Sequence, residues 1–151
     1  MTSSVMTWRF ARPIPAAMKH PIGPAPSIED MEAAARAAFQ RLPKAFAQHL
    51  GHVVIQVQDF AEDELLAEMG IEHAFELTGV YEGLPLTERS IEHSGIMPDR
   101  IRLFRMPILL EWCERGDETF EHLVAHVLIH EIGHHFGLSD DDMHALEDEV
   151  R

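Results

Sequence analysis

The spacing of apolar residues predicts two helices at the start of the folded part of the chain. Ser27, followed three residues later by Asp30, is typical of a helix N-cap. Apolar residues then recur at helical spacing as far as Leu42, which predicts an amphipathic first helix. Residues 43–50 form a short continuation that Gly51 closes.

The middle of the chain is predicted to supply the strands of a sheet. Residues 52–58 are rich in β-branched side chains, residues 75–81 favour a second strand, and residues 62–69 have the pattern of a short helix. Residues 100–105 alternate charged and apolar side chains, which indicates a strand with one face in water. We expect residues 101–105 to form the edge of the sheet.

The C-terminal third of the chain is predicted to contain three helices. The first is opened by Pro107 and runs to residue 115, and the second covers residues 118–136 with Asp117 as its N-cap. Apolar residues occupy most of the circumference of this second helix, so it belongs in the core. The last helix begins at Asp140 or Asp141 and runs to the C-terminus.

Composition limits the class of protein. The 151 residues are 46% hydrophobic, which is sufficient for one core, and no apolar run approaches the ~20 residues of a membrane span. The single cysteine, Cys113, excludes an internal disulfide and is typical of a reducing compartment, so we expect a cytoplasmic protein without membrane attachment. Acidic neighbours on both sides of Cys113 favour an ordinary thiol over a nucleophile.

Residues 1–26 differ from the rest of the chain. Five prolines occur between Pro13 and Pro26, and no acidic residue precedes Glu29. This composition predicts an extended tail before a single domain at residues 27–151. An organelle transit peptide, or a start codon assigned too early, would have the same composition.

The net charge of −14 bears on the choice of partner. The chain has 26 acidic residues against 12 lysines and arginines, so its field repels phosphate backbones. We therefore expect no nucleic-acid partner.

A metal-binding pattern lies in the main helix. His130 and His134 are four residues apart, which places both imidazoles on one helical face where they can bind one zinc ion. Glu131 lies beside this pair and can take a proton from metal-bound water. Gly137 ends the helix, and the reversed chain can bring Asp140 back as a third ligand, leaving a fourth position for water.

The third ligand is open to alternatives. Acids at the start of a helix are expected for capping and dipole reasons alone. The competitors of Asp140 are Asp141, Asp142, His144 and Glu147, with Glu147 the runner-up. Two histidines and a carboxylate also suit iron(II). His122 and His126 continue the same stripe, and we expect ordinary hydrogen-bonding roles for them.

The pattern H-E-x-x-H-x-x-G-x-x-D, with His130, Glu131, His134, Gly137 and Asp140, resembles that of the Asp-zincin metallopeptidases. The chain from about residue 27 onward is similar to the small bacterial zincin-like proteins called mini-zincins. The matching segments are residues 78–83, 85–89, 98–101 and 130–137. This resemblance implies an α+β fold, in which a mixed sheet of three or four strands packs against the H-E-x-x-H helix and further helices. No methionine turn follows the motif, so the likeness to larger metzincins is partial.

The resemblance implies a zinc-dependent metallopeptidase that acts on a peptide or protein substrate, with Glu131 as general base. His93 is a candidate donor to the oxyanion, and residues 101–105 could pair with an extended substrate. Two other hypotheses remain: a zinc-binding or interaction domain without activity, and a metal-dependent endoribonuclease, which the acidic charge disfavours. Homodimer formation is left open.

Overall fold

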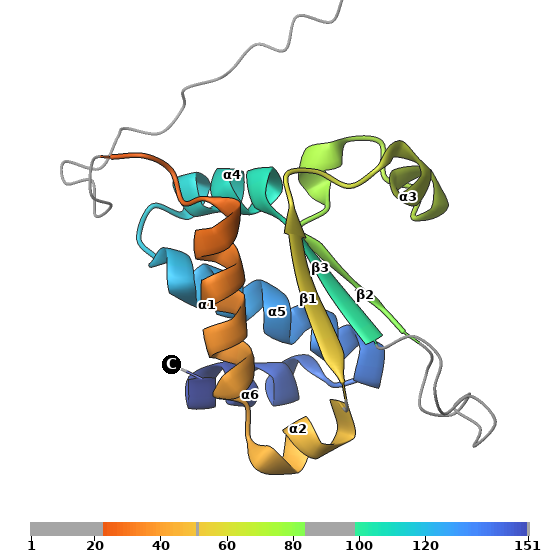
Figure 1. Cartoon of the computed structure of the whole chain (residues 1–151). Helices are drawn as coiled ribbons and strands as arrows, with labels where there is room; N and C mark the ends of the chain where they lie inside the picture. Colours follow the sequence, from red (N-terminus) through yellow and green to blue (C-terminus); the bar gives the residue numbers. More distant parts are fainter. Residues whose placement is uncertain (1–22, 51, 84–98, 151) are drawn as a thin grey trace, which may run out of the picture.

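The computed structural model describes residues 23–50, 52–83 and 99–150, and Figure 1 shows their arrangement. The elements, in chain order, are α1 (Ile28–Gln40), α2 (Lys44–Leu50), β1 (Val53–Gln58), α3 (Asp63–Glu68), the 3₁₀ helix η1 (Ala74–Glu76), β2 (Gly79–Glu82), β3 (Asp99–Phe104), α4 (Arg105–Arg115), α5 (Phe120–Phe136) and α6 (Asp140–Val150). Most of the predicted tail and the loop that contains His93 lie outside the described residues, so the proposed domain boundaries stay a prediction.

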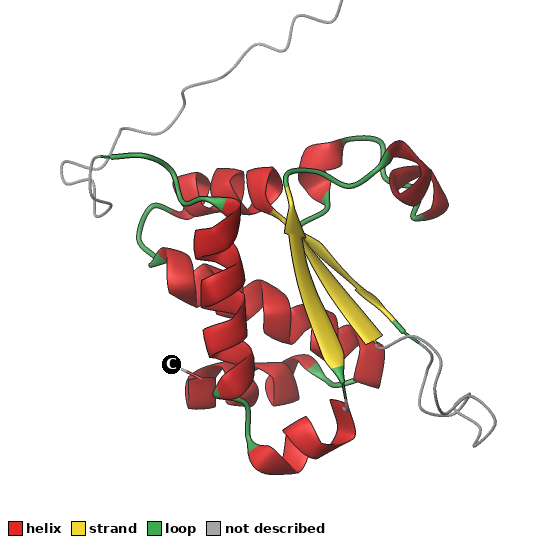
Figure 2. Cartoon of the chain, in the orientation of Figure 1, coloured by secondary structure: helices red, strands yellow, loops and turns green. Residues whose placement is uncertain are grey.

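Within the described residues, the sheet has three strands in the order β1-β3-β2. β1 runs parallel to β3, and β2 runs antiparallel to it, so the sheet is mixed. The helices flank this sheet (Figure 2), which confirms the predicted α+β class. In the described part of the chain, no helix is both long and apolar enough to cross a membrane.

The prediction that residues 101–105 form a sheet edge is wrong, because β3 is the central strand. The alternation of charged and apolar residues indicates which side chains share a face of the strand. It does not indicate whether other strands pair with it on one side or on both. The charged face is also less exposed to solvent than its composition suggests. Arg102 is only 7% exposed and forms ion pairs with Glu62 and Glu82, each at 2.8 Å.

The two faces of β3 pack against different layers. Ile101 and Leu103 are fully buried in the main core, which α1 and α5 supply from one side of the sheet. Phe104 points to the other face and joins a smaller cluster with Leu66 of α3 and Leu77. α1 and α5 therefore cover one face of the sheet, and the smaller cluster lies at the C-terminal end of β3, beside α3 (Figure 1).

Two predicted helix starts differ from the structure: α4 begins at Arg105, two residues before the predicted start at Pro107, and the cap of α5 is not the predicted one. Ser27 and Asp30 form the expected capping box at α1. α5 is capped by Thr119, whose hydroxyl accepts a hydrogen bond from the backbone of His122, and the predicted cap at Asp117 is wrong. The indole of Trp112 donates to the carbonyl of Glu118 at 2.8 Å, which holds residue 118 outside the helix.

The predicted strand at residues 75–81 is correct only in its last part. Residues 74–76 form η1, and β2 begins at Gly79. The main antiparallel pairing therefore covers Gly79–Glu82 against the central part of β3, from Arg100 to Leu103.

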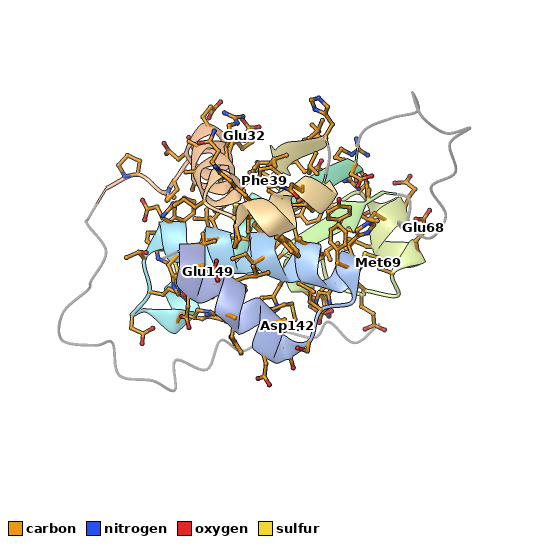
Figure 3. All side chains as sticks on the ribbon, turned by 90° about the horizontal axis from the view of Figure 1, so that it is seen from below. Glu32, Phe39, Glu68, Met69, Asp142 and Glu149 are labelled. Carbon is orange, nitrogen blue, oxygen red and sulfur yellow. The ribbon has the colours of Figure 1, made fainter. Side chains whose placement is uncertain are left out.

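α6 packs closely on α5 at Gly133. A Cβ built on Gly133 would lie 2.7 Å from Cγ of Met143 and closer still to its sulfur, and Met143 is buried. Figure 3, seen from below, shows α6 on the outside of α5 with Asp142 and Glu149 among its side chains. The absence of a side chain at residue 133 thus sets how closely the two helices approach.

We expect Gly133→Ala to lower the free energy of unfolding by about 1–2 kcal/mol. Alanine gains up to ~1 kcal/mol of helix propensity, but overpacking a buried site costs typically 1–3 kcal/mol, and the overpacking term is larger here. Urea unfolding measures the change. Met143→Ala in the same protein should relieve the clash, so the double variant should be more stable than the two single losses predict. Additive losses would contradict this account of the packing.

Candidate metal centre

Four histidines form a stripe along α5 at intervals of four residues: His122, His126, His130 and His134. The side of α5 facing the core is fully apolar, whereas these histidines are partly or fully exposed. The ring centroids of His126 and His130 are 4.2 Å apart, and those of His130 and His134 are 6.1 Å apart. The helix therefore presents successive imidazoles on one face, as their spacing predicts.

α6 brings one carboxylate to this face. Oε1 of Glu147 lies 2.7 Å from Nδ1 of His126 and 3.1 Å from Nε2 of His130. Glu147 is only 8% exposed, although its side chain is acidic. Among the described residues, His126, His130 and Glu147 form one group whose possible ligand atoms all lie within 4.8 Å of one another.

Of the three predicted ligands, only His130 belongs to this group. His130 is in this group, whereas His134 lies one turn further along α5 and is exposed. Asp140 is the first residue of α6 and is also exposed, and it is not in the group. The set His130, His134 and Asp140 stays a prediction. Glu147, the runner-up as third ligand, is the carboxylate that reaches His130.

The sequence contains a pattern that could have identified Glu147 and its histidine partners. Met143, Glu147 and Val150 are all buried and follow one another at intervals of four and three residues, so an acid occupies the apolar face of α6. A buried acid needs a partner, and the histidine stripe is the partner that the sequence supplies. His126 was expected to have an ordinary role because the motif begins only at His130.

The atoms at the centre of the group suit a divalent cation. Nε2 of His130 and Oε1 of Glu147 are both buried and neither makes a hydrogen bond, although they are only 3.1 Å apart. Burial lowers the pKa of His130, with repulsion from His126 adding to the effect, and this favours the neutral imidazole that binds metals. Neutral imidazole and carboxylate are donors for zinc and for iron(II).

Glu131 lies between α5 and the sheet. A Cβ built on Gly79, the first residue of β2, would lie 3.1 Å from Cγ of Glu131, so the strand passes directly against this side chain. Burial raises the pKa of Glu131 to about 7. A carboxylate with such a pKa can both accept and release a proton near neutral pH.

The end of α5 is fixed to the sheet by aromatic stacking. The ring of His135 stacks on Tyr81 of β2, with centroids 3.9 Å apart. The hydroxyl of Tyr81 in turn donates to Asp99 of β3 at 2.7 Å. This arrangement holds the H-E-x-x-H turn in a fixed position relative to β2.

A groove of about 1170 Å³ opens beside the histidine stripe. α4, α5 and α6 contribute to its walls, and its lining includes His122, His126 and Glu147. Solvent and small ions can therefore approach the group of His126, His130 and Glu147 from this side.

The raised pKa of Glu131 predicts a pH-dependent stability of the metal-free protein. Folding favours the protonated form of Glu131. The contribution of this group to the free energy of unfolding is therefore complete below pH 4.5 and is lost as the pH rises to about 7. In EDTA, Glu131→Gln should unfold like the wild type near pH 4 and be more stable by roughly 2–3 kcal/mol at pH 8. Urea unfolding at both pH values measures this; an equal difference at both would contradict the burial of Glu131.

The comparisons with known proteins agree with the motif. The family model described as zincin-like metallopeptidase matches residues 50–150, from the end of α2 to the end of α6. No curated protein matches the chain. Members of such a family bind a metal, typically zinc. Because the match covers two thirds of the sequence and includes the histidine helix, the chain belongs to the zincin-like metallopeptidase family.

Proposed function

We propose that this protein is a zinc-dependent peptidase in which Glu131 is the general base. The observation that carries the proposal is the position of Glu131, which is held against β2 and adjoins His130 on the metal-binding helix. Its pKa of about 7 suits transfer of a proton in both directions. The match to a metallopeptidase family supports the same reaction class.

His130 and His134 would hold the metal with Asp140 as the third ligand, in keeping with the motif. The bound metal supplies a Lewis acid that polarises a carbonyl and makes water acidic. Burial lowers the pKa of His130, which favours the neutral imidazole that binds metal. Glu131 accepts a proton from the attacking water and then delivers that proton to the leaving amine.

β2 is the strand on which we propose that an extended substrate binds. Within the described residues it pairs on one side only, with β3, and its first residue contacts Glu131. A peptide added to its other edge would run beside the general base. This proposal replaces residues 101–105, of which 101–104 lie in the central strand and Arg105 begins α4.

Cleavage of a mixed peptide library, followed by mass spectrometry, tests the function. Protein purified without chelators should contain about one zinc per chain and cleave peptides; EDTA should stop cleavage and zinc should restore it. Elemental analysis of the same sample distinguishes zinc from iron. Cleavage that survives complete removal of metal would disprove the proposal.

A metal-binding domain without activity is the second candidate. It is favoured by the structure of the His126, His130 and Glu147 group, in which a histidine and a carboxylate outside the motif approach His130. Stable zinc binding without cleavage of any library peptide would select this alternative. A salt-dependent affinity for RNA would instead revive the endoribonuclease hypothesis.

A further inference from the structure

We propose that His126, His130 and Glu147 form a second position for a divalent transition metal, one helical turn before the predicted pair of His130 and His134. The proposal concerns binding and does not depend on the peptidase activity. Zinc is the ion used to test it, because two imidazoles and a carboxylate are typical zinc ligands.

The distances between the donor atoms are close to those of a metal site. Zinc binds nitrogen and oxygen at about 2.0–2.2 Å, so two ligand atoms of a tetrahedral site are separated by about 3.4 Å. Oε1 of Glu147 lies 2.7 Å from Nδ1 of His126 and 3.1 Å from Nε2 of His130. All the ligand atoms lie within 4.8 Å of one another, so side-chain adjustments of an ångström or two are sufficient.

The carboxylate of Glu147 is buried beside two imidazoles, at a place where a bound cation would compensate its charge. Its side chain is 9% exposed, and its Oε1 is buried without a hydrogen bond. Nε2 of His130, which faces this oxygen, is likewise buried without a hydrogen bond. Burying an ionised carboxylate is costly unless a cation compensates it. A metal ion would satisfy both atoms, whereas a protonated His126 would satisfy the carboxylate alone.

The position is accessible from solvent. His126 and Glu147 line the groove beside α5, and its lining holds more acidic than basic side chains, with Glu121 among the acids and Arg41 and Arg115 as the two arginines. Negative charge along a groove raises the local concentration of cations. An ion can therefore reach Glu147 without opening the core.

The two positions share His130, and this has a consequence for stoichiometry. Nε2 of one imidazole coordinates one ion at a time, so an ion held by His126 and Glu147 withdraws His130 from His134. We therefore expect one zinc per wild-type chain rather than two. Loss of His134 should leave that zinc bound, because the other position remains complete.

Zinc titration by calorimetry, with elemental analysis after dialysis, tests the proposal. The background variant is His134→Ala with Asp140→Asn, which removes the motif position and keeps His126, His130 and Glu147. This background should retain close to one zinc per chain. Adding Glu147→Gln or His126→Ala should weaken zinc binding by roughly 100-fold or more, since each removes one of three ligands.

His122→Ala in the same background is the matched control. His122 lies one turn before His126 on the same stripe but pairs with Glu118, which precedes α5, so its loss should leave zinc affinity unchanged. Circular dichroism establishes that each variant is folded. The side chain of His126 is more exposed than that of Glu147, at 22% against 9%, so His126→Ala decides the question if Glu147→Gln does not fold.

Two results would overturn the proposal: a background variant that binds no zinc, or a His126→Ala protein with unchanged zinc affinity. In the second case Glu147 serves only as the ion-pair partner of an imidazole. Peptidase activity of the wild type is measured separately, so failure of this site leaves the proposed function standing.

Discussion

Glu131→Gln is expected to lower kcat/KM for peptide cleavage by about 10²–10⁴-fold, the usual contribution of a general base. Glutamine has nearly the same shape as glutamate, so its contact with Gly79 can be kept, but its amide cannot accept a proton from water. Zinc content should be unchanged, since Glu131 is outside both sets of ligands. The loss should therefore appear in kcat rather than in metal binding.

The measurement compares initial rates on one library peptide, with zinc content determined on the same preparations. Glu149→Gln is a suitable control, because this exposed acid of α6 lies on the outer surface (Figure 3). It removes the same charge and should cleave at the wild-type rate. A Glu131→Gln protein that cleaves as fast as the wild type would show that another group takes the proton.

Features that depend on neighbours in the chain were predictable from the sequence. The capping box of Ser27 and Asp30 and the left-handed Gly137 after α5 follow from residue types a few positions apart. The common face of His130 and His134 follows from helical geometry alone. The fold class was implied by the family motif, and the observed mixed sheet agrees with it.

Features that depend on contacts between elements were not predictable in the same way. The alternation in residues 101–105 identifies two faces, but the central place of β3 depends on which strands pair with it. Similarly, the first turn of α6 offers three consecutive acids, of which Asp142 is used in a capping interaction with Ser139. A sequence pattern alone does not separate capping acids from ligands.

The choice of the acid that serves as third ligand illustrates this limit most clearly. Gly137 places Asp140 early after the helix, but the docking of α6 decides which acid faces the histidines. That docking is set by the contact of Gly133 with Met143, and it turns Glu147 toward His130. Interhelical packing of this kind has no signature within a single helix, although an acid on an apolar face is a useful indication.

His130→Ala is expected to abolish both zinc binding and peptide cleavage. His130 is the one residue common to the motif set and to the group of His126 and Glu147, so its loss leaves two ligands at either position. Zinc affinity should fall by at least about 100-fold. Cleavage should fall to the rate of the metal-free protein. The fold should persist, because the ring of His130 is only partly buried and Glu147 keeps its contact with His126 at 2.7 Å.

The contrast with His134→Ala makes this prediction specific. His134→Ala should stop cleavage yet retain zinc, whereas His130→Ala should lose both, and His122→Ala should lose neither. Calorimetric zinc titration and the peptide assay on the three variants give this pattern directly. A His130→Ala protein that binds zinc as tightly as the wild type would mean that the ion does not use this imidazole. Both the motif position and the position at Glu147 would then be refuted, since neither can form without it.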